Sequence, residues 1–222
     1  MRRANRKVAE RGLSTEDWLR IAKTTLIKEG VSAVKIDRLA KKGGVTRGGF
    51  YYRFKSRQAL LDALLADWRA TNTQPWLNAL LGPGSPPERF HALIRLWIEE
   101  RDYKPDYDTA VRSWSRISPK VAAAVHGADD TRIEALRQLF IDAGYDDDEA
   151  FIRARITYFH QVGYYAMGVR ESTKRREELS ELYYRVLTGF RNGELKPVAR
   201  RARKAEASPV LEFPPRAGRR GR

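Results

Sequence analysis

Two very short helical patterns meet at a pair of glycines between residues 35 and 60, and this stretch constrains the fold more than any other. The first pattern, residues 36–42, places apolar residues at i, i+3 and i+4 and forms a single apolar stripe. Gly43 and Gly44 are expected to supply the positive φ that ends this helix and turns the chain sharply. The second pattern spans residues 47–53. Two short helices joined by so tight a turn are typical of a helix-turn-helix motif, which docks on DNA.

The second short helix contains two adjacent glycines, Gly48 and Gly49. Each destabilises a helix interior by roughly 1 kcal/mol relative to alanine. One explanation is that the missing side chains let the backbone approach a groove floor or a phosphate closely, with basic and aromatic donors around the bare patch. The other explanation, that the glycines form a plain loop, stays open here. The predicted DNA-binding residues are Lys35, Thr46, Arg47, Gly48, Gly49, Tyr51, Tyr52, Arg53, Lys55 and Arg57.

The same segment carries Leu39-Ala40, Gly44-Val45-Thr46, Gly48, Phe50-Tyr51, Phe54-Lys55 and Arg57-Gln58-Ala59-Leu60 at fixed spacing. This set resembles the DNA-binding signature of TetR-type transcriptional regulators, and the resemblance covers residues 14–68. The resemblance implies that the helix after the motif moves when a ligand binds in a second domain. This movement changes the distance between the two recognition helices of a dimer. Two positions depart from the family pattern: Lys35 stands where a threonine cap is usual, and Arg53 stands where a histidine is common.

The donors of the motif divide into one predicted base reader and several phosphate binders. Arg47 is predicted to contact a base edge, with guanine as the expected base, because a guanidinium at the helix start can form a bidentate bond. We expect the operator to be roughly palindromic, with half-sites spaced by about one DNA turn or slightly more. The predicted phosphate binders are Thr46, Tyr51, Lys55 and Arg57, and the roles of Tyr52 and Arg53 stay open.

Charge is concentrated at the two ends of the chain. Of the net charge of +15, residues 1–62 contribute +10 and residues 191–222 contribute +7, so residues 63–190 carry −2. This distribution favours a localised nucleic-acid footprint with salt-dependent binding over a generally cationic protein. The basic tail is predicted to be disordered, and whether it contacts DNA or only solubilises the chain stays open.

Helical patterns account for the rest of the chain, so the predicted fold is all-α. A first helix follows Leu13 and stops at Gly30, and a connecting helix begins near Ser56 and is interrupted at Pro75. After a loop at residues 82–87, helices are predicted at 88–102, 106–116, 119–143, 147–170 and 174–190. The predicted organisation is a basic arm (1–12), a helix-turn-helix domain (13–62), a helical ligand-binding and dimerisation domain (63–191) and a basic tail (192–222).

Aromatic and polar residues are concentrated in the second domain and indicate a cavity between helices. Such a mixture binds largely apolar molecules with a few polar anchors, although aromatics at helical spacing are more often ordinary core. Arg112 is the most distinctive, because it lies among apolar neighbours and needs an anionic partner such as Asp108 if it is buried. The predicted pocket residues are Trp97, Tyr103, Tyr107, Arg112, Trp114, Tyr158, His160, Gln161, Tyr164 and Tyr165.

The last two predicted helices carry more apolar surface than one small subunit readily buries. We expect them to pair with their symmetry mates in a four-helix bundle, as is usual in the family that the chain resembles. A monomer with an amphipathic covering helix is the alternative. The predicted dimer interface is Ile156, Phe159, Gly163, Leu179, Leu182, Tyr183, Val186, Leu187 and Phe190.

Several function classes find no support in the sequence. The chain has no cysteine, no metal-ligand cluster, no phosphate-binding glycine loop and no nucleophile motif, so we expect neither an enzyme nor a cofactor. It has no apolar run of membrane-spanning length, and a cytoplasmic location is expected. The predicted function is a dimeric repressor released from double-stranded operator DNA by a small-molecule effector. A ligand-independent DNA-binding protein and a small-molecule-binding protein with a vestigial DNA module are the alternatives.

Overall fold

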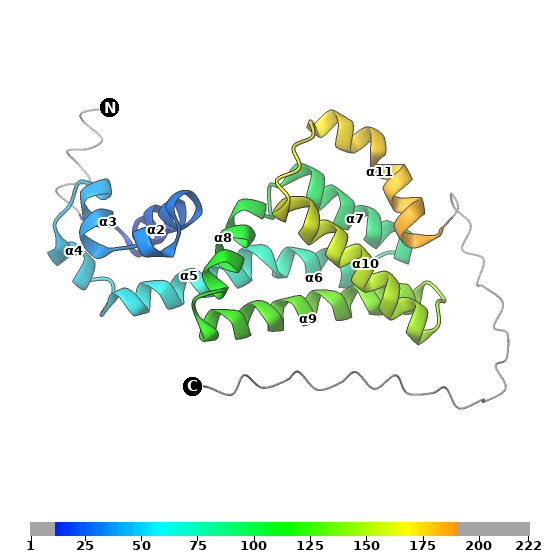
Figure 1. Cartoon of the computed structure of the whole chain (residues 1–222), viewed down its shortest axis with the longest axis horizontal. Helices are drawn as coiled ribbons and strands as arrows, with labels where there is room; N and C mark the ends of the chain where they lie inside the picture. Colours follow the sequence, from blue (N-terminus) through cyan, green and yellow to red (C-terminus); the bar gives the residue numbers. More distant parts are fainter. Residues whose placement is uncertain (1–11, 191–222) are drawn as a thin grey trace, which may run out of the picture.

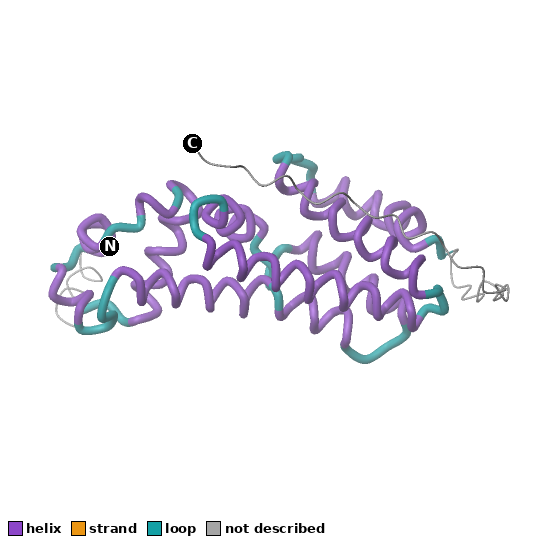
Figure 2. Tube along the Cα trace, turned by 60° about the horizontal axis from the view of Figure 1, so that its bottom comes forward, coloured by secondary structure: helices purple, strands orange, loops and turns teal. Residues whose placement is uncertain are grey.

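The computed structural model describes residues 12–190, and this part of the chain is helical throughout, without a strand (Figure 1; Figure 2). The predicted arm (1–12) and tail (192–222) therefore lie outside the described residues, apart from Gly12. The molecule is elongated: α2, α3 and α4 lie at one end, and α5 leads from them into the larger helical body. The elements are α2 (Thr15–Glu29), η1 (Val31–Ala33), α3 (Ile36–Gly43), α4 (Arg47–Tyr51), α5 (Arg57–Asn72), α6 (Gln74–Leu81), α7 (Pro86–Glu99), α8 (Pro105–Ser115), α9 (Pro119–Asp142), α10 (Asp147–Ala166) and α11 (Thr173–Thr188).

Local signals in the sequence set most helix starts. Ser14 caps α2 by accepting a hydrogen bond from the Asp17 amide, and the Asp17 carboxylate accepts one from the Ser14 backbone amide. Ser118 and Asp146 also cap α9 and α10 with their side-chain oxygens. Four helices of the body, α6, α7, α8 and α9, have a proline in their first turn, where the missing amide hydrogen costs nothing.

Several features of the chain differ from the prediction. Pro75 does not end the helical pattern: it lies in the first turn of α6, a helix that the sequence pattern did not predict, after a break at Thr73. Only Gly44 has a positive φ in the glycine pair, whereas Gly43 is the last residue of α3. A Cβ atom on Gly43 would lie 2.6 Å from the Leu13 side chain, so Gly43 serves close packing. The helix predicted at 147–170 ends earlier, at Ala166.

One apolar cluster joins the end that carries α2, α3 and α4 to the body. It is built around Trp18, Phe50 and Trp68, all fully buried, and it also includes Tyr107 and Val111 of α8. The cluster therefore crosses the boundary predicted at residues 62 and 63, because α8 packs against both α2 and α5. A second cluster fills the body between α6, α7, α9, α10 and α11. The end that carries α2, α3 and α4 is thus packed directly onto α8, and it is also connected to the body through α5.

A buried ion pair between α8 and α9 lies between these two clusters. Arg132 is 0% exposed and donates from Nη1 and Nη2 to Asp108 Oδ1, both over 3.2 Å. Trp68 of α5 donates its indole N–H to the same carboxylate oxygen over 3.0 Å. Arg132 Nη2 also donates to the Asn72 carbonyl and to Thr73 Oγ1, at the break between α5 and α6. Burial alone raises the pKa of Asp108, but the guanidinium groups of Arg132 and Arg112 outweigh it and hold the pKa below its ordinary value.

Removing the Asp108 charge should destabilise the protein strongly. We expect Asp108→Asn to lower the free energy of unfolding by about 3 kcal/mol at neutral pH, because it leaves the Arg132 charge buried without its counter-ion. Asp106→Asn, the same change at an exposed site on α8, should have little effect. Urea unfolding of both variants measures the difference.

The effect of Asp108→Asn should depend on pH. Because the folded-state pKa of Asp108 lies below its unfolded value, its charge contributes fully above pH about 4 and loses its contribution as the pH falls through the folded-state pKa. The stability difference between wild type and Asp108→Asn should therefore shrink on acidification. A difference that stays constant between pH about 7 and pH about 3 would contradict this role for the carboxylate.

Candidate nucleic-acid interface and effector pocket

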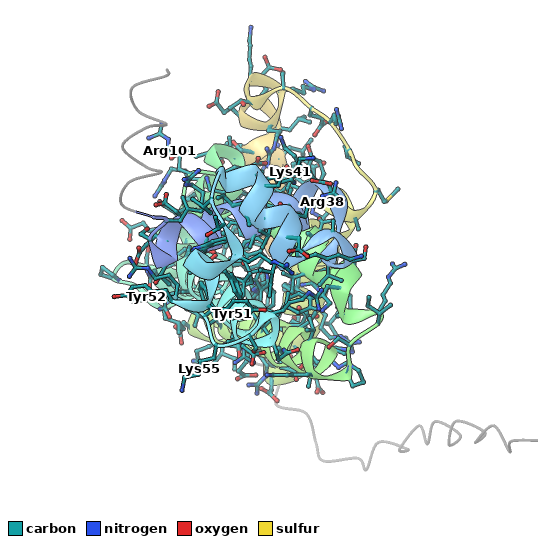
Figure 3. The ribbon with its side chains drawn as sticks, turned by 90° about the vertical axis from the view of Figure 1, so that its left-hand side faces the viewer. Arg38, Lys41, Tyr51, Tyr52, Lys55 and Arg101 are labelled. Carbon is teal, nitrogen blue, oxygen red and sulfur yellow. The ribbon has the colours of Figure 1, made fainter. Side chains whose placement is uncertain are left out.

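The short helix α4 is fixed by its inner side and presents its outer side to solvent. Phe50 is fully buried, and its ring meets that of Trp18 edge-to-face with 5.3 Å between the centroids. Tyr51 and Tyr52 are exposed to solvent, and Tyr52 is 81% exposed. Figure 3 shows both tyrosines with Lys55 at the end of the molecule that faces the viewer. The fold therefore presents aromatic hydroxyls and a lysine on one outer surface.

Arg47 begins α4 and extends into solvent. Its Nε lies 3.0 Å from Asp37 Oδ1 of α3, but both side chains are largely exposed. An exposed ion pair of this kind contributes less than about 1 kcal/mol, so it does not prevent Arg47 from binding another acceptor. Thr46 occupies the N-cap position of α4 without a side-chain hydrogen bond to the helix. The Thr46 hydroxyl is therefore not occupied by capping the helix.

Two arginines of the predicted set already bond to the protein backbone. Arg57 donates from Nε to the Val34 carbonyl over 2.6 Å and from Nη2 to the Val31 carbonyl over 3.0 Å, so it ties α5 to the turn around η1. Arg53 donates from Nε to the Leu13 carbonyl over 3.2 Å. Their first role in this structure is to hold the motif together, and phosphate binding by their other donors stays a prediction.

Three further positions complete the description of this end. Lys35 is exposed at the N-cap of α3 and forms no side-chain cap there, as expected for a residue that replaces threonine. Lys41 of α3 was not in the predicted set, yet it is exposed at the same end of the molecule (Figure 3). Arg38, on the same polar side of α3, pairs with Glu29. The polar face of α3 was visible in the sequence, but which of its cations lie beside α4 depends on the packing of the two helices.

The glycines of α4 are not required by the fold. A Cβ atom on Gly49 would meet no atom within 4 Å, and one on Gly48 would meet only Thr46 Oγ1, at 3.7 Å. Neither glycine has a positive φ, so alanine could adopt the same backbone. The bare surface that they create, rather than a turn, is the feature that needs an explanation.

A small pocket lies between α7, α10 and α11, with a volume of about 50 Å³. Of the predicted pocket residues, it brings together Trp97, His160, Gln161 and Tyr164. Burial lowers the pKa of His160, which favours the neutral imidazole. The lining residues that the prediction missed are Ile94, Ile98, Glu171, Arg176, Ser180, Tyr183 and Leu187.

The other predicted pocket residues lie elsewhere. Arg112 has the expected partner Asp108, at 2.7 Å, and also bonds to Asp129 and to the Tyr158 hydroxyl. Arg112 and Tyr158 therefore belong to the buried ionic network rather than to the pocket. The remaining four lie in different places: Tyr107 and Trp114 lie in the core cluster that includes Trp18, Tyr103 lies in the core cluster of the body, and Tyr165 is partly buried and packs against the latter.

Arg176 closes one side of the pocket. Its guanidinium donates from Nη1 to Glu100 Oε1 over 2.6 Å and from Nη2 to the Trp97 carbonyl over 2.5 Å. The Tyr165 hydroxyl also lies within hydrogen-bond distance of Glu100 and Arg176. Glu100 ends α7 with a φ of 51°, the one non-glycine residue in the described part of the chain with a positive φ. This ion pair therefore holds α11 against a strained helix end.

Apolar side chains remain exposed on α10 and α11. Ile156 and Phe159 of α10 and Leu182 and Val186 of α11 are each about half exposed or more, with Val186 at 69%. The residues of the predicted dimer interface nevertheless differ in burial, and some of them are not available to a partner. Leu187 and Phe190 are buried within their own subunit, because the inner side of α11 packs on α7, so they cannot be central to a dimer contact.

Residues 19–64 match the family described as "Bacterial regulatory proteins, tetR family". This match falls on the helices whose geometry is given above. These residues form a DNA-binding domain of the TetR family. TetR-family proteins are DNA-binding transcriptional regulators rather than enzymes, so the prediction that this chain is not an enzyme is confirmed.

Two curated relatives extend the similarity beyond the motif. The chain is 25% identical over 166 residues to the HTH-type transcriptional regulator SrpR of Pseudomonas putida, an alignment that covers 72% of this chain and 63% of SrpR. It is also 25% identical over 144 residues to the uncharacterised HTH-type transcriptional regulator TtgW of Pseudomonas putida, covering 65% of this chain and 84% of TtgW. The chain thus spans less than two thirds of SrpR.

Solved structures agree with the fold. The reduced form of E. coli NemR superposes with a TM-score of 0.60 at 18% identity, covering 76% of this chain and 95% of NemR. Salmonella enterica GusR superposes with a TM-score of 0.60 at 18% identity, covering 79% of this chain and 93% of GusR. Within residues 12–190 of this TetR-family chain, no helix has the length and apolar character needed to cross a membrane.

Alanine at Gly49 should separate folding from DNA binding in this TetR-family protein. Because the added methyl group meets open space, we expect Gly49→Ala to raise the free energy of unfolding by roughly 0.5–1 kcal/mol. If the bare surface faces DNA closely, the same change should weaken DNA binding on the order of tenfold, since overpacking costs about 1–3 kcal/mol. The control is Gly127→Ala on α9, which also adds a methyl group in open space and should stabilise without affecting DNA binding. Unchanged DNA affinity in Gly49→Ala would refute close approach.

Proposed function

We propose that this TetR-family regulator is a dimeric repressor that a small molecule releases from a roughly palindromic operator. The observation that carries the DNA-binding part is the outer surface of α4, where exposed donors surround two glycines that the fold does not need. A phosphate or base edge can approach such a surface closely and meet charged and hydroxyl donors around it. Arg47 is the proposed base reader, and Lys55, Tyr51 and Thr46 are proposed phosphate contacts, to which the exposed Lys41 is added.

The proposal of a dimer is supported by the exposed apolar residues on α10 and α11. Ile152, Ile156, Phe159 and Gly163 recur along one side of α10 at helical spacing, and Leu182 and Val186 follow one another by one turn on α11. Contiguous exposed apolar patches on soluble proteins mark interaction sites. A two-fold contact of these helices would cover the patch with itself, and it would place two α4 helices on one DNA duplex.

The proposal of an effector is supported by the position of the pocket relative to the buried network. Gln161 lines the pocket, and Tyr158, one turn earlier on α10, bonds to Arg112 and Arg132. Arg132 in turn bonds to the Asn72 carbonyl at the end of α5. A shift of α10 on ligand binding would therefore reach α5, whose other end leads to the recognition helices.

The division between base and phosphate contacts can be tested on operator sequences selected from a random pool. We expect Arg47→Ala to lose about 1–3 kcal/mol of discrimination at one base pair in each half-site. Lys55→Ala should weaken binding to all sequences to a similar extent and should reduce the salt dependence by about one phosphate contact. The reverse pattern would refute the assignment, and a failure to select any sequence would refute operator recognition itself.

The dimer can be tested with charges on the exposed apolar patch. We expect the double variant Ile156→Glu, Val186→Glu to be a folded monomer, because both positions are exposed in one subunit and only a partner would bury the new charges. The control is Ile117→Glu, which places a charge on another exposed apolar residue and should leave the dimer intact. Sedimentation equilibrium measures the mass of each. A wild-type mass equal to one subunit at every concentration would contradict the dimer.

A further inference from the structure

Four of the nine buried side-chain polar atoms that have no hydrogen-bond partner in the described part of the chain lie in the pocket lining or within one helical turn of it. Among the described residues, Trp97 Nε1, Gln161 Nε2, His160 Nδ1 and Thr157 Oγ1 are buried and have no hydrogen-bond partner. Gln161 and Trp97 are each only 5% exposed, and both line the pocket. Buried polar groups without a partner are uncommon and call for an explanation. Two of these atoms, the indole and amide nitrogens, are donors, so the group that satisfies them is an acceptor.

The walls of the pocket are mainly aromatic and apolar, and the one cation among them is paired. Trp97, Tyr164 and Tyr183 contribute aromatic rings to the lining, and Ile94, Ile98 and Leu187 contribute aliphatic surface. The one cation in the lining, Arg176, is paired with Glu100. The Tyr164 hydroxyl donates to Glu171, the acid in the lining. An anionic ligand would therefore find no unpaired cation in the lining.

We propose that the pocket binds a neutral, flat aromatic molecule whose carbonyl-type oxygen accepts hydrogen bonds from Gln161 and Trp97. This inference rests on the proposed function, since it names the effector class of that site. The rings supply flat apolar contact, and the unpartnered donors select a ligand with an acceptor over a hydrocarbon of the same shape. The neutral form of His160, favoured because burial lowers its pKa, agrees with an uncharged guest.

The pocket must widen for such a ligand, and α11 is the wall that can move. The volume of about 50 Å³ is well below the roughly 300–1,000 Å³ of common ligand sites. The first two turns of α11 have no buried residue, and Arg176 bonds them to the end of α7. The buried residues of α11 lie in its second half, at Tyr184, Leu187 and Thr188. Opening at the Arg176 end therefore exposes little core.

The test compares two probes of the same shape. Acetophenone carries a carbonyl oxygen where α-methylstyrene carries a methylene group, and benzoate adds a charge. With the indole nitrogens of the full chain labelled with ¹⁵N, Trp97→Phe identifies the Trp97 signal. We expect acetophenone to shift this signal saturably and to bind about three- to tenfold more tightly than α-methylstyrene, the range for one or more hydrogen bonds. Benzoate should bind more weakly than acetophenone.

A matched pair of variants assigns the preference to Gln161. Gln161→Leu should weaken acetophenone binding about three- to tenfold and leave α-methylstyrene unchanged or tighter. Gln138→Leu, which removes an amide on α9 away from the pocket lining, should change neither affinity. Because the two-probe comparison uses the wild-type chain, it remains decisive if Gln161→Leu does not fold.

Three outcomes would overturn the inference. Equal affinity for acetophenone and α-methylstyrene would show simple apolar filling, tighter binding of benzoate would show an anion site, and no saturable shift would show no site for this class. Probe binding is measured without DNA, so it is independent of the proposed repressor function. If acetophenone binds as expected and operator affinity does not change, the ligand class stands and the proposed release mechanism fails.

Discussion

The buried pair of Asp108 and Arg132 is the interaction on which the arrangement of the helices depends. Taking two charges out of water is costly unless each is held by its partner and by further hydrogen bonds. Arg132 meets this condition with Asp108, the Asn72 carbonyl and the Thr73 hydroxyl, and its guanidinium also lies over the rings of Trp68 and Trp76, 5.5 Å from each centroid. These partners come from α5, α6, α8 and the break between α5 and α6. One side chain of α9 thus fixes where the connecting helix ends and how the body meets it.

The same network explains why a signal could pass from the body to the DNA-binding end. The apolar cluster around Trp18 and Trp68 packs α2, α5 and α8 together, so these helices cannot easily shift independently. Tyr107 adds a hydrogen bond from its hydroxyl to the Leu64 carbonyl of α5 over 2.6 Å. Burial raises the pKa of Tyr107 far above its ordinary value, so the hydroxyl stays protonated and keeps donating. A displacement of α8 or α9 would therefore be transmitted to α5 rather than absorbed.

The sequence predicted the helix bounds that depend on local chemistry, but it did not predict the features that depend on packing between distant segments. Serine and aspartate caps, first-turn prolines and Gly44 act within a few residues, and the helices that they start or end lie close to the predicted bounds. The helix α6 was missed because Pro75 ends one helix or begins another depending on the residue before it, and the break at Thr73 is held by Arg132, far along the chain. Arg112 was correctly expected to need an acid, whereas its assignment to the pocket was not supported, since no pattern distinguishes a buried network from a cavity wall.

The proposed effector site and the buried network differ in how firmly they are held, and this difference favours a regulator. Around Arg132, the helices α5, α6, α8 and α9 are fixed by buried charges and apolar contacts. Small movements of these helices relative to one another therefore cost considerable free energy. At the pocket, the first two turns of α11 have no buried residue and are held through Arg176, which pairs with Glu100 and donates to the Trp97 carbonyl, and Glu100 itself has a strained backbone with a positive φ. A ligand that displaces this wall works against weak restraints, while α10 on the opposite wall connects to stiff ones through Tyr158. Ligand binding in the pocket would thus displace α11 at a small free-energy cost. Its effect on α10 would be transmitted to α5 through the stiff network around Arg132.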